Sequence, residues 1–321
     1  MKRKFDINNM HNKKSKALWS KEQSGKIKNT IKGATKLSYF VPLVVFMCIF
    51  KVWPFIQILI TSFKENYNFL TKDYSGIGVE NYVDVLSDGY FIQAIGNTFL
   101  YTVLVVLITN ILSIIISWCL YSVKKFTSFF QTAIFLPFIT SNIAIGMAWR
   151  IIFNEKGILN AVLGAFGIDA ISWLADSSMS LTTLTIYGVW SNIPFTVLIY
   201  LTFLLSLDKD IIVSAAADGA GEVKTIFKII LPMMMPTIMM TTIINSISSW
   251  LEINALFPLF SGDPGPYHDL YTVVYYIYTK MQKGGNAFGI ACASSILLFA
   301  CIAIFMILRF VALRKKRGAA E

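Results

Sequence analysis

Residues 97–122 read NTFLYTVLVVLITNILSIIISWCLYS, and this stretch contains no Asp, Glu, Lys or Arg. A helix rises 1.5 Å per residue, so about 20 apolar residues are enough to cross roughly 30 Å of hydrocarbon. The block exceeds that length and carries no charge that would oppose insertion into a membrane. It predicts a transmembrane helix.

Blocks of the same kind recur along the chain and predict six transmembrane spans. They lie at about 37–61, 97–122, 126–152, 181–206, 233–259 and 287–313. Of the 321 residues, 55% are hydrophobic and 14% charged, whereas a typical soluble domain has about 45–50% and about 25%. We therefore expect an all-α polytopic membrane protein. Its parts would be a six-span domain, 37–313, between basic tails at 1–36 and 314–321.

The distribution of Lys and Arg predicts the orientation of the chain, because cationic loops tend to remain in the cytoplasm. Of the 28 basic residues, 21 lie in residues 1–36, in the loops after the second and fourth spans, and in the end of the chain from Arg309 onward. Only five lie in the alternate loops. Both termini are therefore predicted to be cytoplasmic. This result requires an even number of spans and so agrees with six.

The net charge of +10 is concentrated in these cytoplasmic segments, above all in residues 1–36. A basic tail can bind nucleic acid, but this one has few aromatic residues and no recognisable nucleic-acid-binding fold. We interpret it as a solvated tail that enforces the orientation and contacts anionic lipid headgroups. The expected partner of the tail is the lipid bilayer, and no nucleic acid is expected.

Sequence patterns for catalysis or metal binding are not found. The four cysteines lie inside apolar blocks and the two histidines, His11 and His268, lie far apart, so neither a disulfide framework nor a metal site is predicted. The chain has no Gly-x-x-x-x-Gly-Lys-Ser/Thr run, nucleophile elbow or His-Glu-x-x-His motif. We expect no enzyme activity and no cofactor, so any nucleotide chemistry must come from another subunit.

The fifth apolar block contains a polar stretch, which is costly inside a membrane. Asn245, Ser249 and Glu252 follow i, i+4, i+7 and would share one helix face. Together with Trp250 and Asn254 they offer the amide, hydroxyl, carboxylate and aromatic groups that bind a polyhydroxylated solute. We expect this stretch to line the substrate path. The alternative is that Ser and Asn join neighbouring helices, as they commonly do in membranes.

The loop between the fourth and fifth spans, 207–232, is too polar to cross a membrane but has the composition of folded protein. An alanine run favours a first helix, Gly219 and Gly221 interrupt it, and apolar residues at i, i+3, i+4, i+7 predict a second helix. The apolar stripe consists of Val223, Ile226, Phe227 and Ile230. Such a stripe must be buried, either on the membrane surface or in a groove of another protein.

At this loop the sequence resembles the permease subunits of bacterial binding-protein-dependent ABC importers. The run AAADGA at 215–220, followed by Phe227 and Leu231-Pro232, is similar to the family's cytoplasmic EAA loop. Similarity to the carbohydrate-uptake subgroup is found at Phe135-Leu136-Pro137, Trp149-Arg150, Gly157-Ile158-Leu159-Asn160 and Gly262-Asp263-Pro264. The resemblance extends from about residue 36 to residue 315.

The resemblance implies a type I ABC importer permease fold in the bacterial cell membrane, with a sugar or oligosaccharide as the solute. The implied partners are a cytoplasmic ATPase dimer, a second permease subunit and an extracellular solute-binding protein. The loop would insert into a cleft of the ATPase, and ATP-driven closure would rock the permease halves so that a central cavity opens to alternate sides. The residues expected to couple to the ATPase are Ala215, Ala216, Asp218, Gly219, Ala220, Phe227, Leu231 and Pro232.

The sequence departs from the family pattern at Val213, which stands where the loop's glutamate is usually found. Either Asp208, Asp210 or Glu222 replaces the carboxylate that would meet the ATPase, or the contact is apolar. The alternative function is an ion-coupled carrier or a membrane-embedded enzyme that acts without an ATPase. In that reading Glu252 would be a proton or cation site. The ordered, amphipathic loop favours the importer.

Overall fold

The computed structural model describes residues 39–123, 127–263, 265–266 and 269–318. The predicted N-terminal tail, 1–36, lies outside these residues. Most of the described chain is helical, as predicted for an all-α membrane protein. A short antiparallel hairpin of two strands is the one sheet among the described residues. Its strands are β1 (Lys64–Glu65) and β2 (Gly76–Ile77).

The chain divides into two compact units, one up to Ile60 and one from Thr61 onward. The helical elements of the first unit are α2 (Val41–Met47), the π-helical turn η1 (Cys48–Val52) and α3 (Trp53–Ser62), whose last two residues belong to the second unit. Those of the second unit are α4 (Glu80–Ser87), α5 (Gly89–Ser122), α6 (Thr127–Ile139), α7 (Asn142–Ile152), α8 (Ile158–Ala165), α9 (Ser177–Ser206), α10 (Lys209–Ala217), α11 (Glu222–Thr225), the π-helical turn η2 (Ile226–Ile230), α12 (Leu231–Trp250), α13 (Leu256–Phe260), α14 (Val273–Lys283) and α15 (Ala287–Gly318).

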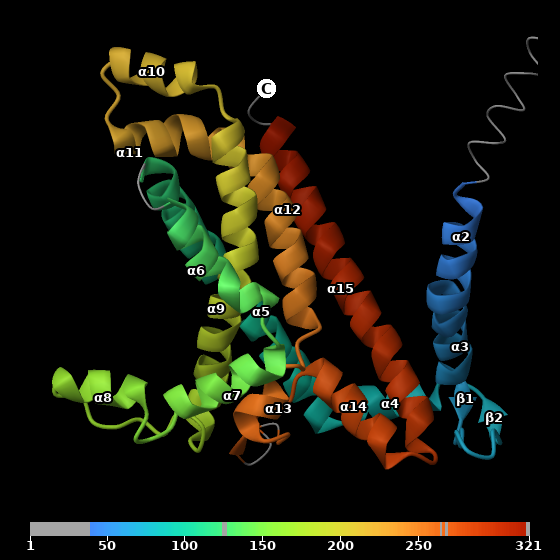
Figure 1. Cartoon of the computed structure of the whole chain (residues 1–321). Helices are drawn as coiled ribbons and strands as arrows, with labels where there is room; N and C mark the ends of the chain where they lie inside the picture. Colours follow the sequence, from blue (N-terminus) through green and yellow to red (C-terminus); the bar gives the residue numbers. More distant parts are fainter. Residues whose placement is uncertain (1–38, 124–126, 264, 267–268, 319–321) are drawn as a thin grey trace, which may run out of the picture. The chain divides into compact units, whose positions relative to one another are not determined.

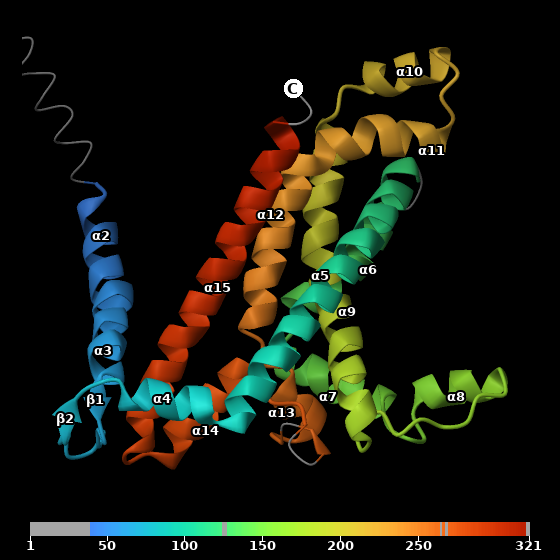
Figure 2. The same ribbon diagram turned by 180° about the vertical axis from the view of Figure 1, so that it is seen from behind.

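Within the second unit, the long helices α5, α6, α9, α12 and α15 run between two ends (Figures 1 and 2). We call the end that carries α10 and α11 the loop end, and the end that carries α4, α7, α13 and α14 the far end. Helix α5 packs along α9, and α12 packs against α5, α9 and α15. The long helices therefore form one packed group that connects the two ends.

Five described helical stretches are long and apolar enough to cross a membrane, and α6 with α7 makes a sixth if the pair is counted as one span. The predicted third span, 126–152, is not one straight helix, because α6 and α7 meet at 104°. At the junction the Thr140 hydroxyl donates to the Leu136 carbonyl at 2.7 Å, and the backbone of Ser141 leaves the helical region, with φ −59° and ψ 125°. A side chain that bonds to the preceding turn competes with continuation of the helix and bends it.

The predicted fifth span, 233–259, also differs from the structure, because α12 ends at Trp250 and α13 begins only at Leu256. Between them, the carboxylate of Glu252 accepts a hydrogen bond from the amide N–H of Ala255 at 2.9 Å. Ala255 is the residue that precedes the first turn of α13. The polar side chain thus starts a new, short helix instead of extending the old one.

Polar side chains join the three central helices in the interior of the second unit. The Tyr200 hydroxyl of α9 hydrogen-bonds to Asn110 of α5 and, at 2.8 Å, to Thr241 of α12. In a membrane, such a bond between helices contributes about 0.6 kcal/mol on average. These bonds and the packing around them hold α5, α9 and α12 together as one body.

Candidate functional site

Helix α10 at the loop end is bounded by two local hydrogen-bonding motifs. The carboxylate of Asp208 accepts the amide N–H two residues further on, at 3.1 Å, and so caps the start of the helix. At the other end, the Ala220 N–H donates to the Ala215 carbonyl at 2.9 Å and the Gly219 N–H to the Ala216 carbonyl at 3.0 Å. This is a Schellman motif, in which Gly219 takes the left-handed conformation with φ +74°. The glycine bend predicted from the sequence is confirmed at Gly219.

The second half of the loop is helical from α11 through η2 into α12, and α11 lies across the direction of α12 (Figures 1 and 2). The N–H of Leu231 donates to the carbonyl of Ile226, five residues back. Pro232 follows, and because it lacks an N–H and its ring crowds the preceding turn, the helix widens to a π turn before it. The same arrangement precedes Pro54 in the first unit, where the five-residue bond reaches Cys48. Leu231-Pro232 therefore marks the point where the loop passes into a span.

Three apolar side chains of the loop are exposed: Val213 by 65%, Val223 by 69% and Phe227 by 64%. Ile230, in contrast, is buried, and Ile226 is half-buried. The apolar stripe predicted along the second helix is therefore divided, with one pair of residues turned outward and the other packed inside the protein. Exposed apolar residues on a polar loop indicate a surface that another molecule covers.

A groove of about 730 Å³ lies between the loop and the ends of α5 and α9. Its lining residues are Ile212, Ala216, Ala220, Glu222 and Thr225 of the loop, with Trp118, Tyr121, Ser122 and Leu205 of the two long helices. The expected coupling residues are thus distributed over different surroundings. Two of them line the groove (Ala216 and Ala220), one is buried (Ala215), one is half-buried (Leu231), and four are exposed (Asp218, Gly219, Phe227 and Pro232).

Three of the expected substrate-path residues are buried between the long helices. Asn245 donates to the Thr196 hydroxyl of α9 at 3.0 Å, which matches the alternative that polar residues join helices. The ring of Trp250 lies 6.3 Å from that of Phe305 on α15, centroid to centroid. The hydroxyl of Ser249 and the indole N–H of Trp250 are buried and make no hydrogen bond within the described residues.

Glu252 lies beyond the end of α12, so the prediction that it shares a helix face with Asn245 and Ser249 is wrong. The Glu252 side chain is half-buried, and its carboxylate accepts the Ala255 N–H at 2.9 Å. The carboxylate lies close enough to the hydroxyls of Tyr101 and Tyr187 to act on both electrostatically. Asn254, the remaining expected path residue, is exposed.

Aromatic side chains from α5, α7 and α9 gather around the far end of α9. The ring of Trp149 lies 6.3 Å from that of Tyr187 and 5.2 Å from that of Trp190. Gly188 makes room for the Tyr101 hydroxyl, since a Cβ at this position would lie 2.3 Å from it. Sequence reasoning missed Tyr101 and Tyr187 because single aromatic residues in an apolar block give no periodic signal. Ring faces, hydroxyls and a carboxylate together suit a polyhydroxylated solute.

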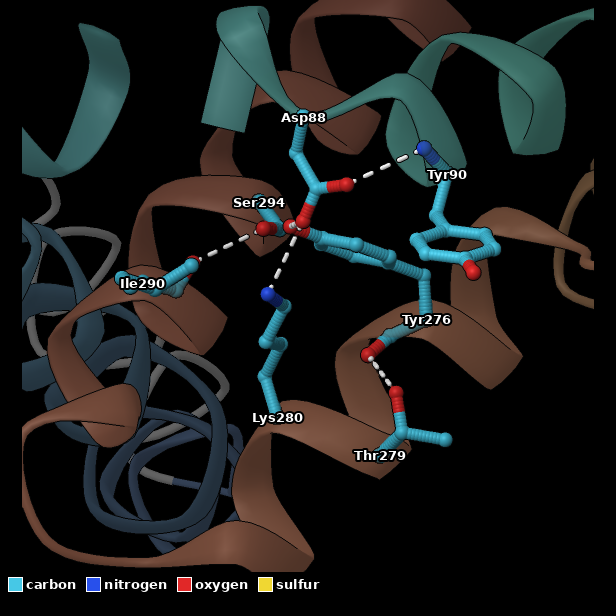
Figure 3. Close-up of polar contacts among 7 residues, drawn as sticks. All are labelled: Asp88, Tyr90, Tyr276, Thr279, Lys280, Ile290 and Ser294. Atoms are coloured by element: carbon cyan, nitrogen blue, oxygen red, sulfur yellow. Dashed lines mark hydrogen bonds and ion pairs between the residues drawn. The ribbon is translucent and has the colours of Figure 1, made fainter. Parts of the chain in front are cut away.

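Asp88 ties the start of α5 to α14 at the far end (Figure 3). One carboxylate oxygen accepts hydrogen bonds from the Tyr276 hydroxyl at 2.7 Å and the Lys280 ammonium at 2.9 Å, and the other accepts the Tyr90 N–H at 3.0 Å. Burial alone would raise the pKa of Asp88, but these hydrogen bonds outweigh it and lower the pKa. Burial and the adjacent carboxylate raise the pKa of Tyr276. The sequence offers no local signal for this cluster, because its partners lie far apart in the chain.

Comparison with known proteins agrees with this architecture. Residues 109–317 match the model of a family described as the binding-protein-dependent transport system inner membrane component. A probable ABC transporter permease protein of Mycoplasma pneumoniae is 31% identical over 81% of this chain and 79% of its own length. The lactose transport system permease protein LacF of Rhizobium radiobacter is 27% identical over 87% of this chain and 94% of its own.

A solved structure shows the same fold. It is the structure of a bacterial ABC transporter involved in the import of the acidic polysaccharide alginate. One chain of that transporter superposes on this chain with a TM-score of 0.76 and 21% sequence identity. The match covers 90% of this chain and 98% of the transporter chain. The fold is that of the permease subunits of type I ABC importers. The chain belongs to the family of binding-protein-dependent transport system inner membrane components.

Proposed function

We propose that the chain is the permease subunit of an ABC importer that passes a sugar or oligosaccharide from an external binding protein into the cytoplasm. Lactose and alginate transport among the similar proteins support this class of solute. The observation that carries the proposal is the loop end, where two helices meet at Gly219 and the second continues into a span. A partner ATPase would supply the energy, since this chain has no nucleotide-binding motif.

The loop end would face the cytoplasm together with both termini, as the distribution of Lys and Arg supports. An ATPase subunit would cover the exposed side chains of Val213, Val223 and Phe227. We infer an apolar contact at Val213, because the carboxylate of Asp208 already caps α10. The far end would then face the solute-binding protein, and a second permease subunit would complete the pore.

The geometry suits the transmission of a movement from the loop to the spans. The chain is helical without interruption from α11 to α12, so a displacement of the loop carries α12 with it. Helix α12 is hydrogen-bonded to α9 through Thr241 and Asn245, and α9 to α5 through Tyr200. A push on the loop would therefore rock the whole group of helices, as alternating access requires.

The solute would meet the aromatic cluster near Glu252 first. Asn254 is exposed and Trp190 half-exposed there, so these residues are accessible before the helices move. The Ser249 hydroxyl and the Trp250 N–H have no hydrogen-bond partner among the described residues. When the helices separate, the hydroxyl would donate or accept a hydrogen bond with a solute, and the indole N–H would donate one. Asn245 is assigned to helix packing instead, because Thr196 already accepts its hydrogen bond.

The ion-coupled alternative rests on Glu252 as a proton or cation site. In the structure this carboxylate accepts the Ala255 N–H and so has an ordinary structural use at the start of α13. This arrangement does not favour a carrier that works without an ATPase.

The proposal is tested by Gly219→Val with Gly167→Val as a matched control. Gly167 ends α8 in the same left-handed conformation, with φ +78°, and a Cβ at either glycine would meet nothing within 4 Å. A residue with a Cβ is destabilised by about 1–2 kcal/mol in the left-handed conformation. This free energy corresponds to about a tenfold change in the equilibrium between the native backbone conformation and its alternatives. We expect Gly219→Val to lower solute-stimulated ATP hydrolysis of the reconstituted complex by about tenfold, with normal membrane insertion.

Gly167→Val should leave solute-stimulated ATP hydrolysis near the wild-type value. Unchanged uptake in Gly219→Val would show that the loop is not the coupling element. Transport of a sugar by the purified chain without any ATPase would overturn the importer assignment as a whole.

A further inference from the structure

The hairpin after the first span holds apolar side chains outward. Leu70 at its tip is 85% exposed and Ile77 on β2 is 76% exposed. Part of the turn's backbone is bonded within the turn, since the Asn68 side chain accepts the Leu70 N–H at 2.9 Å and the Asn68 carbonyl accepts the Lys72 N–H at 2.8 Å. Each backbone group that is paired within the turn lowers the cost of bringing the loop against an apolar layer.

Helix α4, which follows the hairpin, has three distinct faces. Val85 is buried in the protein. Val83 and Leu86 form an exposed apolar stripe, and Glu80 and Asp84 form an exposed acidic stripe beside it. A helix with one face in protein, one apolar face and one charged face is typical of a membrane boundary.

Two contacts fix the depth of this segment relative to the spans. The Asn81 side chain donates to the carbonyl of Ser62, the last residue of the first apolar helix, at 3.0 Å. The ring of Phe69 lies 4.7 Å from that of Phe288, the second residue of α15. Helix α4 itself lies across the direction of α15 (Figures 1 and 2). These contacts place the segment beside Ser62 and Phe288, at the ends of two apolar helices that are each long enough to span a membrane.

We propose that residues 63–90 form an interfacial segment that rests in the lipid headgroup layer at the far end. Leu70, Ile77, Val83 and Leu86 contact acyl chains, and the acidic stripe of α4 faces water. Lys64 lies 5.2 Å and 4.9 Å from the ring centres of Tyr67 and Tyr74, a pairing of amine and aromatic residues that suits the headgroup level. A protein partner would cover both the apolar and the acidic stripe of α4. At a lipid boundary, the apolar stripe faces acyl chains and the acidic stripe faces water, which is the arrangement that α4 presents.

The test compares neighbouring positions on α4 in the full-length chain with its partner subunits. The four native cysteines are replaced, and a spin label is placed at Val83→Cys, Leu70→Cys or Asp84→Cys. Asp84 is the matched control, because it is one residue from Val83 but on the acidic stripe. Collision with oxygen, which concentrates in lipid, and with a water-soluble nickel chelate is then measured in phosphatidylcholine vesicles.

We expect labels at positions 70 and 83 to collide with oxygen several-fold more than with the nickel chelate, and the label at position 84 to show the reverse. Equal access of the chelate at positions 83 and 84 would overturn the proposal. Protection of position 83 only after a solute-binding protein is added would do so as well and would assign the surface to that protein. The proposal requires only that the chain spans a membrane, so its failure would leave the importer assignment untouched.

Discussion

At the far end, Phe91, Trp250 and Tyr276 pack into one core with the first turns of α15. At the loop end, Val213, Val223 and Phe227 lie at the surface, and a groove separates α10 from the ends of α5 and α9. Both ends are built from short helices, but the core of the far end buries large side chains, whereas the loop end leaves three apolar side chains exposed. The difference supports the proposal that an ATPase subunit covers the loop end.

The two ends also differ in how their short helices are held in place. At the far end, the carboxylate of Asp88 accepts three hydrogen bonds and joins α14 to α5. Gly146 of α7 packs so closely on Pro258 of α13 that a Cβ at this glycine would lie 2.3 Å from the proline ring. At the loop end, by contrast, α10 is bounded by hydrogen bonds within its own two caps. This difference suits the proposal, in which the loop moves with the ATPase while the far end receives the solute-binding protein.

The largest expected effect is the difference in the free energy of unfolding between Phe91→Ala and Phe227→Ala. Phe91→Ala removes a fully buried ring and should lower the free energy of unfolding by about 3–5 kcal/mol. Phe227→Ala, at an exposed position, should change it by less than about 0.5 kcal/mol but reduce solute-stimulated ATP hydrolysis. Thermal unfolding of the purified variants and ATP turnover of the reconstituted complex measure both. Equal destabilisation by the two changes would show that the loop end is packed like the far end.

A smaller effect is expected from Val213→Glu, which restores a carboxylate at the position where the family has one. If the ATPase contact is apolar here, an unpaired carboxylate is buried at a cost of about 1–3 kcal/mol, and coupled ATP hydrolysis should fall about tenfold. Val213→Leu keeps the apolar character and should remain close to wild type. Higher solute-stimulated ATP hydrolysis in Val213→Glu would instead indicate that a basic residue of the ATPase pairs with a glutamate at this position.

The smallest effect is expected from Asp88→Asn at the far end. Loss of this half-buried ion pair should lower the free energy of unfolding by about 1 kcal/mol. Because the pKa of Asp88 is lowered in the folded protein, its stabilising effect is complete above the ordinary Asp value of about 3.9 and is lost as the pH falls through the folded value. The unfolding temperatures of the two proteins should therefore differ at pH 7 and converge toward pH 3. A difference that persists in acid would assign the effect to packing.

Local patterns predicted the parts of the fold that depend on neighbouring residues. The predicted ends of the second and fourth spans, 122 and 206, are those of α5 and α9, and Gly219 ends α10 as expected. In the third and fifth blocks the structure differs from one uninterrupted helix, and there Thr140 and Glu252 bond to nearby backbone groups at the breaks. A single polar residue lowers the mean hydropathy of such a block only slightly, so hydropathy does not predict a break in the helix.

The amino-acid sequence by itself determined that the chain is a helical membrane protein with an ordered, amphipathic loop, because backbone groups in hydrocarbon must bond within their own helix. Only the tertiary structure decided which residues face one another. The spans are apolar on nearly every side, so their sequences prefer no particular face. The pairing of Asn245 with Thr196, and of Asp88 with Lys280, follows from how the helices pack.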